Sequence, residues 1–145
     1  MNWEKLKPVH FFKEPVRHIY TPSVFDTKEY DKLYENQNDL THQVWIDFDS
    51  KYITGYEFKD NFSEINFNKE IMCLWFFKER SDRTISHVVL NGKKLPYTPN
   101  TFLITKSKDI KLEKPKRKFI RHPFVQIDLS LSVWNKILER FDKIS

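Results

Sequence analysis

The sequence predicts an α+β fold, an antiparallel β-sheet of about six to eight strands, rich in hairpins, covered by a C-terminal amphipathic helix and a short N-terminal helix. Short stretches of alternating apolar and polar residues recur between positions 43 and 129, which is typical of half-buried strands. Asn91-Gly92 predicts a two-residue hairpin turn, because both residues tolerate positive φ. Residues 133–144 carry apolar side chains at helical spacing, which predicts the C-terminal helix.

The strands are expected where these short patterns lie. The ranges are 43–49, 52–58, 65–68, 71–77, 84–90, 93–95, 101–105, 110–112 and 125–129. The seven apolar residues of 71–77 form the longest apolar run, which predicts a strand buried on both faces. Cys73 lies within this run and is the one cysteine of the chain, so we expect a core residue with no internal disulfide and no multi-thiolate metal site.

Two helices are predicted from their capping residues and apolar faces. Asp26 as N-cap with Glu29 three positions later forms a capping box, which begins a short helix over residues 25–36. Ser132 is the expected cap of the helix over 133–144, whose apolar face we expect to pack on the sheet.

The chain is expected to consist of an extended, proline-containing arm over residues 1–24 and a single α+β domain over 25–145. Pro8, Pro15 and Pro22 recur at equal spacing in the arm, and each removes a backbone donor, which excludes a long helix or a central strand. Four apolar residues would anchor the arm to a partner or to its own domain, an alternative that the sequence leaves open. They are Phe11, Phe12, Ile19 and Tyr20.

The composition excludes several classes of protein. The chain has no alanine and two glycines while aromatic residues make up 16%, a bias that indicates a low-GC genome such as that of a bacterium, phage or large virus. Without glycine-rich loops, close backbone contact with a phosphate over several residues is excluded, and we expect no cofactor. Charges throughout the N-terminus and the lack of an 18-residue apolar stretch predict an intracellular protein, in a host cytoplasm or a virion, that is neither secreted nor inserted in a membrane.

Residues 106–122 hold the excess positive charge. Eight Lys and Arg against Asp109 and Glu113 give this segment a net charge of +6. The whole chain has a formal net charge of +5, so the rest of the chain carries −1. One interpretation is a strip that binds a polyanion such as nucleic acid, with an aromatic ring stacking on a base. Its contacts would be Lys111, Lys114, Lys116, Arg117, Lys118, Phe119 and Arg121. The other interpretation is a solvated edge strand, whose charges prevent aggregation.

Asp47 and Asp49 lie two residues apart on a predicted strand, so both point to one side. The stretch Ile46-Asp47-Phe48-Asp49-Ser50, followed by Thr54-Gly55-Tyr56, resembles the opening strand and turn of RNase H-like nucleases of the Holliday-junction resolvase kind. That resemblance covers about ten residues and implies a role for Asp47 in holding magnesium, with further acids on later strands and helices between them. The chain shows strand patterns where those helices would come, so a hairpin with a polar face is the alternative interpretation, and no metal ligand set is assigned.

The function expected from these observations is a non-catalytic assembly or interaction protein, such as a virion connector, ring or tail accessory subunit of a phage or virus. Such a protein would contact protein partners, either as a homo-oligomer or in a larger particle. The first alternative is a polyanion- or nucleic-acid-binding regulator, for example an inhibitor of a host system, acting through residues 106–122. The second alternative is a metal-dependent nuclease built on Asp47 and Asp49.

Overall fold

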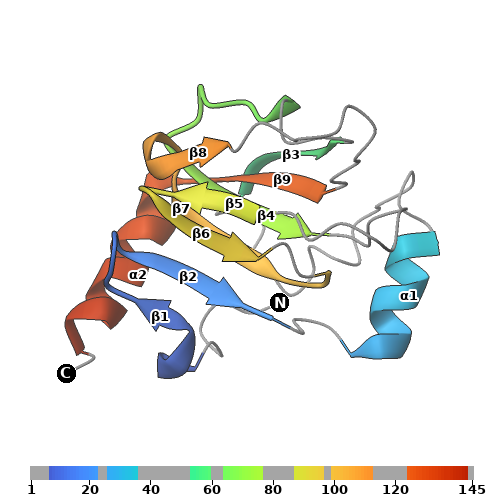
Figure 1. The fold of residues 1–145 in the computed structure, drawn as a ribbon, viewed down its shortest axis with the longest axis horizontal. Coiled ribbons are helices and arrows are strands. Elements are labelled where there is room, and N and C mark those ends of the chain that lie inside the picture. Colours follow the sequence, from blue (N-terminus) through green and yellow to red (C-terminus); the bar gives the residue numbers. More distant parts are fainter. Residues whose placement is uncertain are drawn as a thin grey trace.

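The protein forms an α+β fold in which strands make up two antiparallel sheets (Figure 1). The computed structural model describes residues 7–22, 26–35, 53–59, 64–76, 87–96, 99–112 and 124–143. In this part of the chain the strands are β1 (Phe11–Phe12), β2 (His18–Thr21), β3 (Ile53–Lys59), β4 (Ile71–Phe76), β5 (His87–Leu90), β6 (Lys93–Pro96), β7 (Phe102–Lys106), β8 (Ile110–Leu112) and β9 (Phe124–Leu129). The helices are α1 (Thr27–Glu35) and α2 (Leu131–Lys143), with 3₁₀ turns at Pro8–His10 and Ser107–Asp109. The predicted fold class is confirmed.

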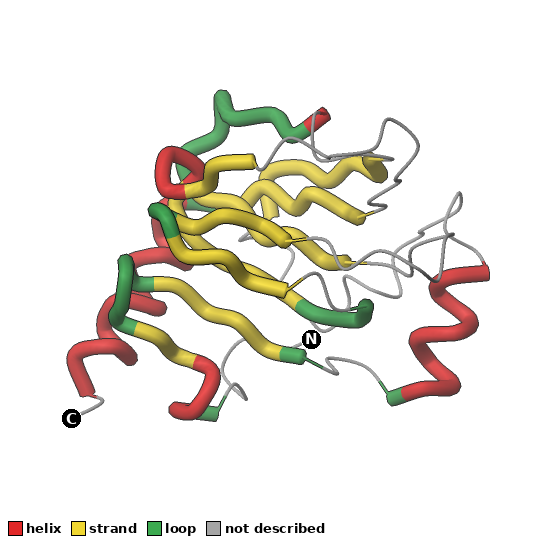
Figure 2. The backbone as a smooth tube through the Cα atoms, viewed as in Figure 1, coloured by secondary structure: helices red, strands yellow, loops and turns green. Residues whose placement is uncertain are grey.

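Within the described residues, six strands form the larger sheet in the order β1-β2-β7-β4-β9-β3, and three form the smaller sheet in the order β6-β5-β8 (Figure 2). Every neighbouring pair is antiparallel. The predicted hairpin is confirmed, because Asn91 and Gly92 have φ values of 46° and 87° between β5 and β6.

The central strand β4 is buried on both faces, as its apolar run predicts. Ile71, Cys73 and Trp75 point to the core shared with α2. Met72 and Leu74, which alternate with them, point to the core under the smaller sheet. The fold therefore has three layers, with α2 on one face of the larger sheet and the smaller sheet on the other.

Helix α2 packs an apolar stripe on the larger sheet. Its buried side chains are those of Val133, Trp134, Ile137 and Phe141. The helix begins at Leu131, so the predicted cap Ser132 is wrong. The first turn is closed instead by Ser130, whose carbonyl accepts a hydrogen bond from the Val133 N–H at 3.2 Å. Among the described residues, neither helix has the length and apolar character needed to cross a bilayer.

Helix α1 begins as its capping residues predict. The Glu29 N–H donates to the Asp26 carboxylate at 2.8 Å, and the Tyr30 N–H donates to the Asp26 carbonyl at 2.9 Å. Tyr30 is buried and belongs to the core shared with α2. In Figure 1, α1 stands beside the end of the sheet that lies away from α2.

Residues 7–22, the described part of the proline-containing N-terminal segment, pair with the larger sheet. Phe11 pairs with Ile19 between β1 and β2, and Ile19 pairs with Ile104 of β7. Phe11 and Ile19 are both buried in the core under α2. β1 is the outer strand of the larger sheet and β2 lies between β1 and β7, so the expectation that this segment forms no interior strand is wrong. β2 (His18–Thr21) fits between Pro15 and Pro22.

The predicted strand over 65–68 is wrong. Ile65 is buried, but the Asn68 N–H donates to the Asn66 side-chain oxygen at 3.0 Å, which closes a local turn. Gln126 of β9 bonds both the N–H and the carbonyl of Asn66. These bonds replace the ladder that the alternating pattern predicted. The predicted strand over 43–49 lies outside the described residues.

Candidate functional site

The part of the basic segment that the structure describes follows the end of β7. Lys106 is the last residue of β7, Lys108 lies in the following 3₁₀ turn, and Lys111 lies in β8, an outer strand of the smaller sheet. Lys108 and Lys111 are exposed and Lys106 is half-buried. The other predicted contacts lie outside the described residues, namely Lys114, Lys116, Arg117, Lys118, Phe119 and Arg121.

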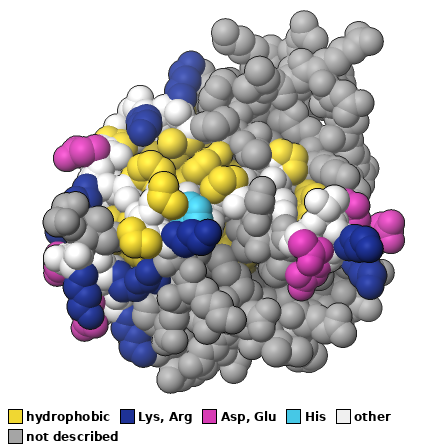
Figure 3. All heavy atoms as spheres, turned by 90° about the horizontal axis from the view of Figure 1, so that it is seen from below, with side chains coloured by type: hydrophobic (Ala, Val, Ile, Leu, Met, Phe, Trp, Pro, Cys, Tyr) yellow, Lys and Arg dark blue, Asp and Glu magenta, His cyan; other side chains and the backbone are white. Residues whose placement is uncertain are grey.

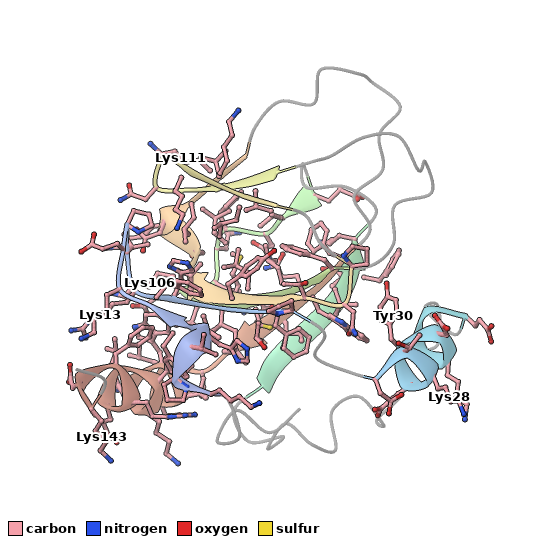
Figure 4. The ribbon with its side chains drawn as sticks, turned by 60° about the horizontal axis from the view of Figure 1, so that its bottom comes forward. Lys13, Lys28, Tyr30, Lys106, Lys111 and Lys143 are labelled. Carbon is pink, nitrogen blue, oxygen red and sulfur yellow. The ribbon has the colours of Figure 1, made fainter. Side chains whose placement is uncertain are left out.

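Strand pairing brings the connection between β1 and β2 next to this segment. Ile19 lies opposite Ile104, and the Thr105 hydroxyl donates to the Arg17 carbonyl at 3.5 Å. Figure 4 shows Lys13, Lys106, Lys111 and Lys143 on one side of the molecule, with Lys28 of α1 on the other.

The last turn of α2 is held against the same connection. The Arg17 guanidinium lies 3.3 Å from the Asp142 carboxylate, and the Arg140 guanidinium carbon lies 4.6 Å from the centre of the Phe11 ring. The ion pair is largely exposed, so it is worth about 1 kcal/mol or less. The contact over Phe11 adds a cation–π interaction. Lys143 is thus placed in the same region as Lys13.

The Ser107 N–H donates to the Glu70 carbonyl at 2.9 Å and the Asn91 N–H donates to the Asp109 carbonyl at 2.9 Å, so residues 69–70 and 91–93 lie beside this segment. We call the resulting surface the basic end and define it by residues 13–17, 69–70, 91–93, 106–111 and 140–143. In these described ranges nine basic residues stand against four acidic ones. The basic residues are Lys13, Arg17, Lys69, Lys93, Lys106, Lys108, Lys111, Arg140 and Lys143, and the acidic ones are Glu14, Glu70, Asp109 and Asp142. Three of the nine, Lys106, Lys108 and Lys111, lie in the segment 106–122, and of these Lys111 is a predicted contact. The other six come from segments far away in the chain. Like charges gathered in this way raise the local positive potential.

An exposed aromatic ring lies at the basic end. The ring of Phe12 stacks on that of His18, with centroids 5.2 Å apart and planes 14° apart, and the Lys93 ammonium lies 5.9 Å from the Phe12 centroid. Phe12 is 37% exposed, whereas His18 is buried and its Nδ1 lies 2.7 Å from the Val16 carbonyl oxygen. Burial lowers the pKa of His18, the hydrogen bond to Val16 raises it, and the charge of Lys93 lowers it further.

The four predicted arm anchors have different surroundings. Phe11 and Ile19 are buried under α2 and contribute to the protein's own core. Tyr20 lies half-buried against the core under the smaller sheet. Phe12 is therefore the anchor residue most accessible to a partner.

A polar cluster on β9 holds the loop that contains Asn66. The Gln126 amide nitrogen donates to the Asn66 carbonyl at 2.8 Å and to the Asp128 carboxylate at 3.1 Å, and its oxygen accepts from the Asn66 N–H at 2.9 Å. Burial raises the pKa of Asp128, while the hydrogen bond from Gln126 and the charge of Lys69 lower it. Because Gln126 has its hydrogen-bonding groups engaged within the protein, we assign this cluster a structural role.

The described ranges contain no group of three or more His, Cys, Asp and Glu side chains placed to hold a metal ion. Asp47 and Asp49, the candidate acids of the nuclease hypothesis, lie outside those ranges.

Comparison with known proteins identifies no relative, since no family model, curated protein or solved structure matches the chain.

Proposed function

We propose that this protein is a binding protein, not a catalyst. Its basic end binds a polyanion, with the phosphate backbone of nucleic acid as the ligand. The observation that supports the proposal is the gathering of Lys13, Lys106, Lys111 and Lys143, which come from three separate segments of the chain, on one side of the molecule (Figure 4). Lysine side chains attract phosphates without reading sequence, and each phosphate contact releases counterions. Residues 113–121, which add five more basic side chains, continue directly from β8 in the chain.

The proposal is tested by measuring binding to a fluorescein-labelled nucleic acid by anisotropy at 50 and 200 mM salt. With about six phosphate contacts, affinity should fall roughly a thousandfold between these salt concentrations. The variant Lys106→Gln with Lys111→Gln should bind more weakly and reduce the salt slope by about 2. The matched control is Lys28→Gln with Lys32→Gln on α1, which should leave affinity and slope unchanged. Absence of binding at 50 mM salt would refute the proposal.

A second candidate is an assembly subunit of a phage or virus, such as a virion connector, ring or tail accessory protein in a host cytoplasm or virion. It is favoured by exposed apolar side chains at the outer strand β1 and the 3₁₀ turn before it: Phe12 of β1 is 37% exposed and Val9 of the turn is 71% exposed. Figure 3 shows apolar side chains gathered on the side of the molecule where β1 lies, with Lys and Arg around them. Exposed apolar surface with a polar rim is typical of protein interfaces.

Light scattering after size exclusion tests the assembly candidate. An assembly subunit should form a defined oligomer or co-elute with a larger particle, and Val9→Glu should weaken that association, because it places a charge in the apolar patch. Lys28→Glu on α1 is the matched control. A point variant is preferable to deletion of residues 1–24, because the deletion removes β1 and β2 from the sheet. A monomer under all conditions tested would count against this candidate.

A further inference from the structure

We infer that the ligand of the basic end is single-stranded nucleic acid and that Phe12 stacks on one of its bases. This inference rests on the proposed polyanion-binding function and adds the ligand class and the contact residue.

The first step is the exposure and fixation of the Phe12 ring. Phe12 and Phe67 are the two exposed phenylalanine rings among the residues whose side chains the structure describes. The position of Phe12 is fixed on β1, because it pairs with His18 of β2 and its ring stacks on the buried imidazole with planes 14° apart. A ring held in this way loses little conformational freedom when a base stacks on it, which favours binding.

The second step is the charge around the ring. The Lys93 ammonium lies 5.9 Å from the Phe12 centroid, Lys13 is the next residue of the chain, and both side chains are exposed. A nucleotide presents a flat base and a phosphate together, so an aromatic ring with the Lys93 ammonium near it matches both parts. This combination of a stacking ring and a cationic surface is the one by which proteins bind single strands without reading sequence.

The third step distinguishes a single strand from a duplex. In a duplex the bases are stacked on each other within the helix, so a surface ring such as Phe12 has no base face to contact. Lysines alone would attract either form through its phosphates. The exposed ring therefore adds affinity for the single strand alone.

The inference is tested by fluorescence anisotropy with an oligothymidylate of about 20 nucleotides, long enough to span a typical site, and with a duplex of the same length. We expect Phe12→Leu to weaken oligothymidylate binding about 5- to 150-fold, the range corresponding to loss of one stacked base. Duplex binding should stay within about twofold, because phosphate contacts are retained. Phe12→Tyr should restore single-strand binding, since it keeps the ring.

The matched control is Phe67→Leu, which removes the other exposed ring and should leave both affinities unchanged. Far-UV circular dichroism confirms that each variant is folded. Two outcomes would overturn the inference without refuting polyanion binding. One is an equal loss of oligothymidylate affinity in Phe12→Leu and Phe67→Leu. The other is an unchanged oligothymidylate affinity in Phe12→Leu. Loss of duplex and single-strand binding to the same degree in Phe12→Leu would also overturn it. No binding to either probe at 50 mM salt would instead refute the proposed function.

Discussion

The ring of Phe11 meets the ring of Phe141 edge-on, with centroids 5.0 Å apart and planes 75° apart. This contact joins β1, near the N-terminus, to the last turn of α2, near the C-terminus. The Arg17 guanidinium carbon lies 5.9 Å from the Phe141 centroid, and Arg17 pairs with Asp142. The junction therefore holds together the two chain segments that supply Lys13 and Lys143 to the basic end.

Phe141→Ala should destabilise the protein by about 3–5 kcal/mol, the range for removing a fully buried aromatic side chain from a core. Phe141 is fully buried and contacts Phe11, so the variant loses both burial and an aromatic pair. Urea denaturation measures the change in the free energy of unfolding. Phe67→Ala, at a 45% exposed position, is the control and should change it by about 0.5 kcal/mol or less. Similar values for the two variants would contradict the packing described.

Gln126→Ala should destabilise the protein by about 1–3 kcal/mol, because it leaves the N–H and carbonyl of Asn66 without their partner. Amide exchange should also accelerate in residues 64–70, the loop that Gln126 holds against β9. Asn135→Ala, at an exposed position of α2, is the control. Unchanged exchange in this loop would show that Gln126 does not hold it.

The sequence predicted features that depend on a few neighbouring residues. The apolar run 71–77 identified the doubly buried strand β4, and Asn91-Gly92 identified the hairpin, since burial and turn geometry are encoded locally in both. The strand expected over 65–68 fails because Gln126, 60 residues away from Asn66, bonds its backbone instead. Local alternation carries no information about that partner.

The basic end was predicted in part, for the same physical reason. Lys106, Lys108 and Lys111 lie within one charged segment that composition alone reveals. Lys13 and Lys143 reach this surface only through the pairing of β2 with β7 and the packing of α2 on β1. In the sequence, both of these lysines lie outside the basic segment 106–122. The strand pairing and the packing of α2 show that the two lie on one surface.

Cys73 should be unreactive in the folded protein and react once the protein unfolds. Burial in the centre of β4 raises the pKa of its thiol far above the ordinary value and excludes reagent. Thiol labelling with a chromogenic disulfide at pH 8 should detect no thiol in buffer and one thiol per chain in urea. The midpoint of labelling in urea should coincide with the midpoint of circular dichroism, since the same unfolding exposes the thiol. Rapid labelling without denaturant would contradict the burial of β4.

The stability of the protein should decrease as pH falls below about 6.5, and His18 should contribute to that decrease. Burial is the main reason that the pKa of His18 is lower in the folded protein than the ordinary value of 6.5. A lowered folded-state pKa means that the unfolded chain binds the proton more readily. The stabilising contribution is therefore complete above about pH 6.5 and is lost as pH falls through the folded-state pKa. His18→Gln should flatten the pH dependence of the free energy of unfolding between about pH 7.5 and 5. His10→Gln should flatten it less, because the His10 side chain is half-buried whereas His18 is buried. An identical pH dependence in the wild-type protein and His18→Gln would show that this imidazole is not desolvated on folding.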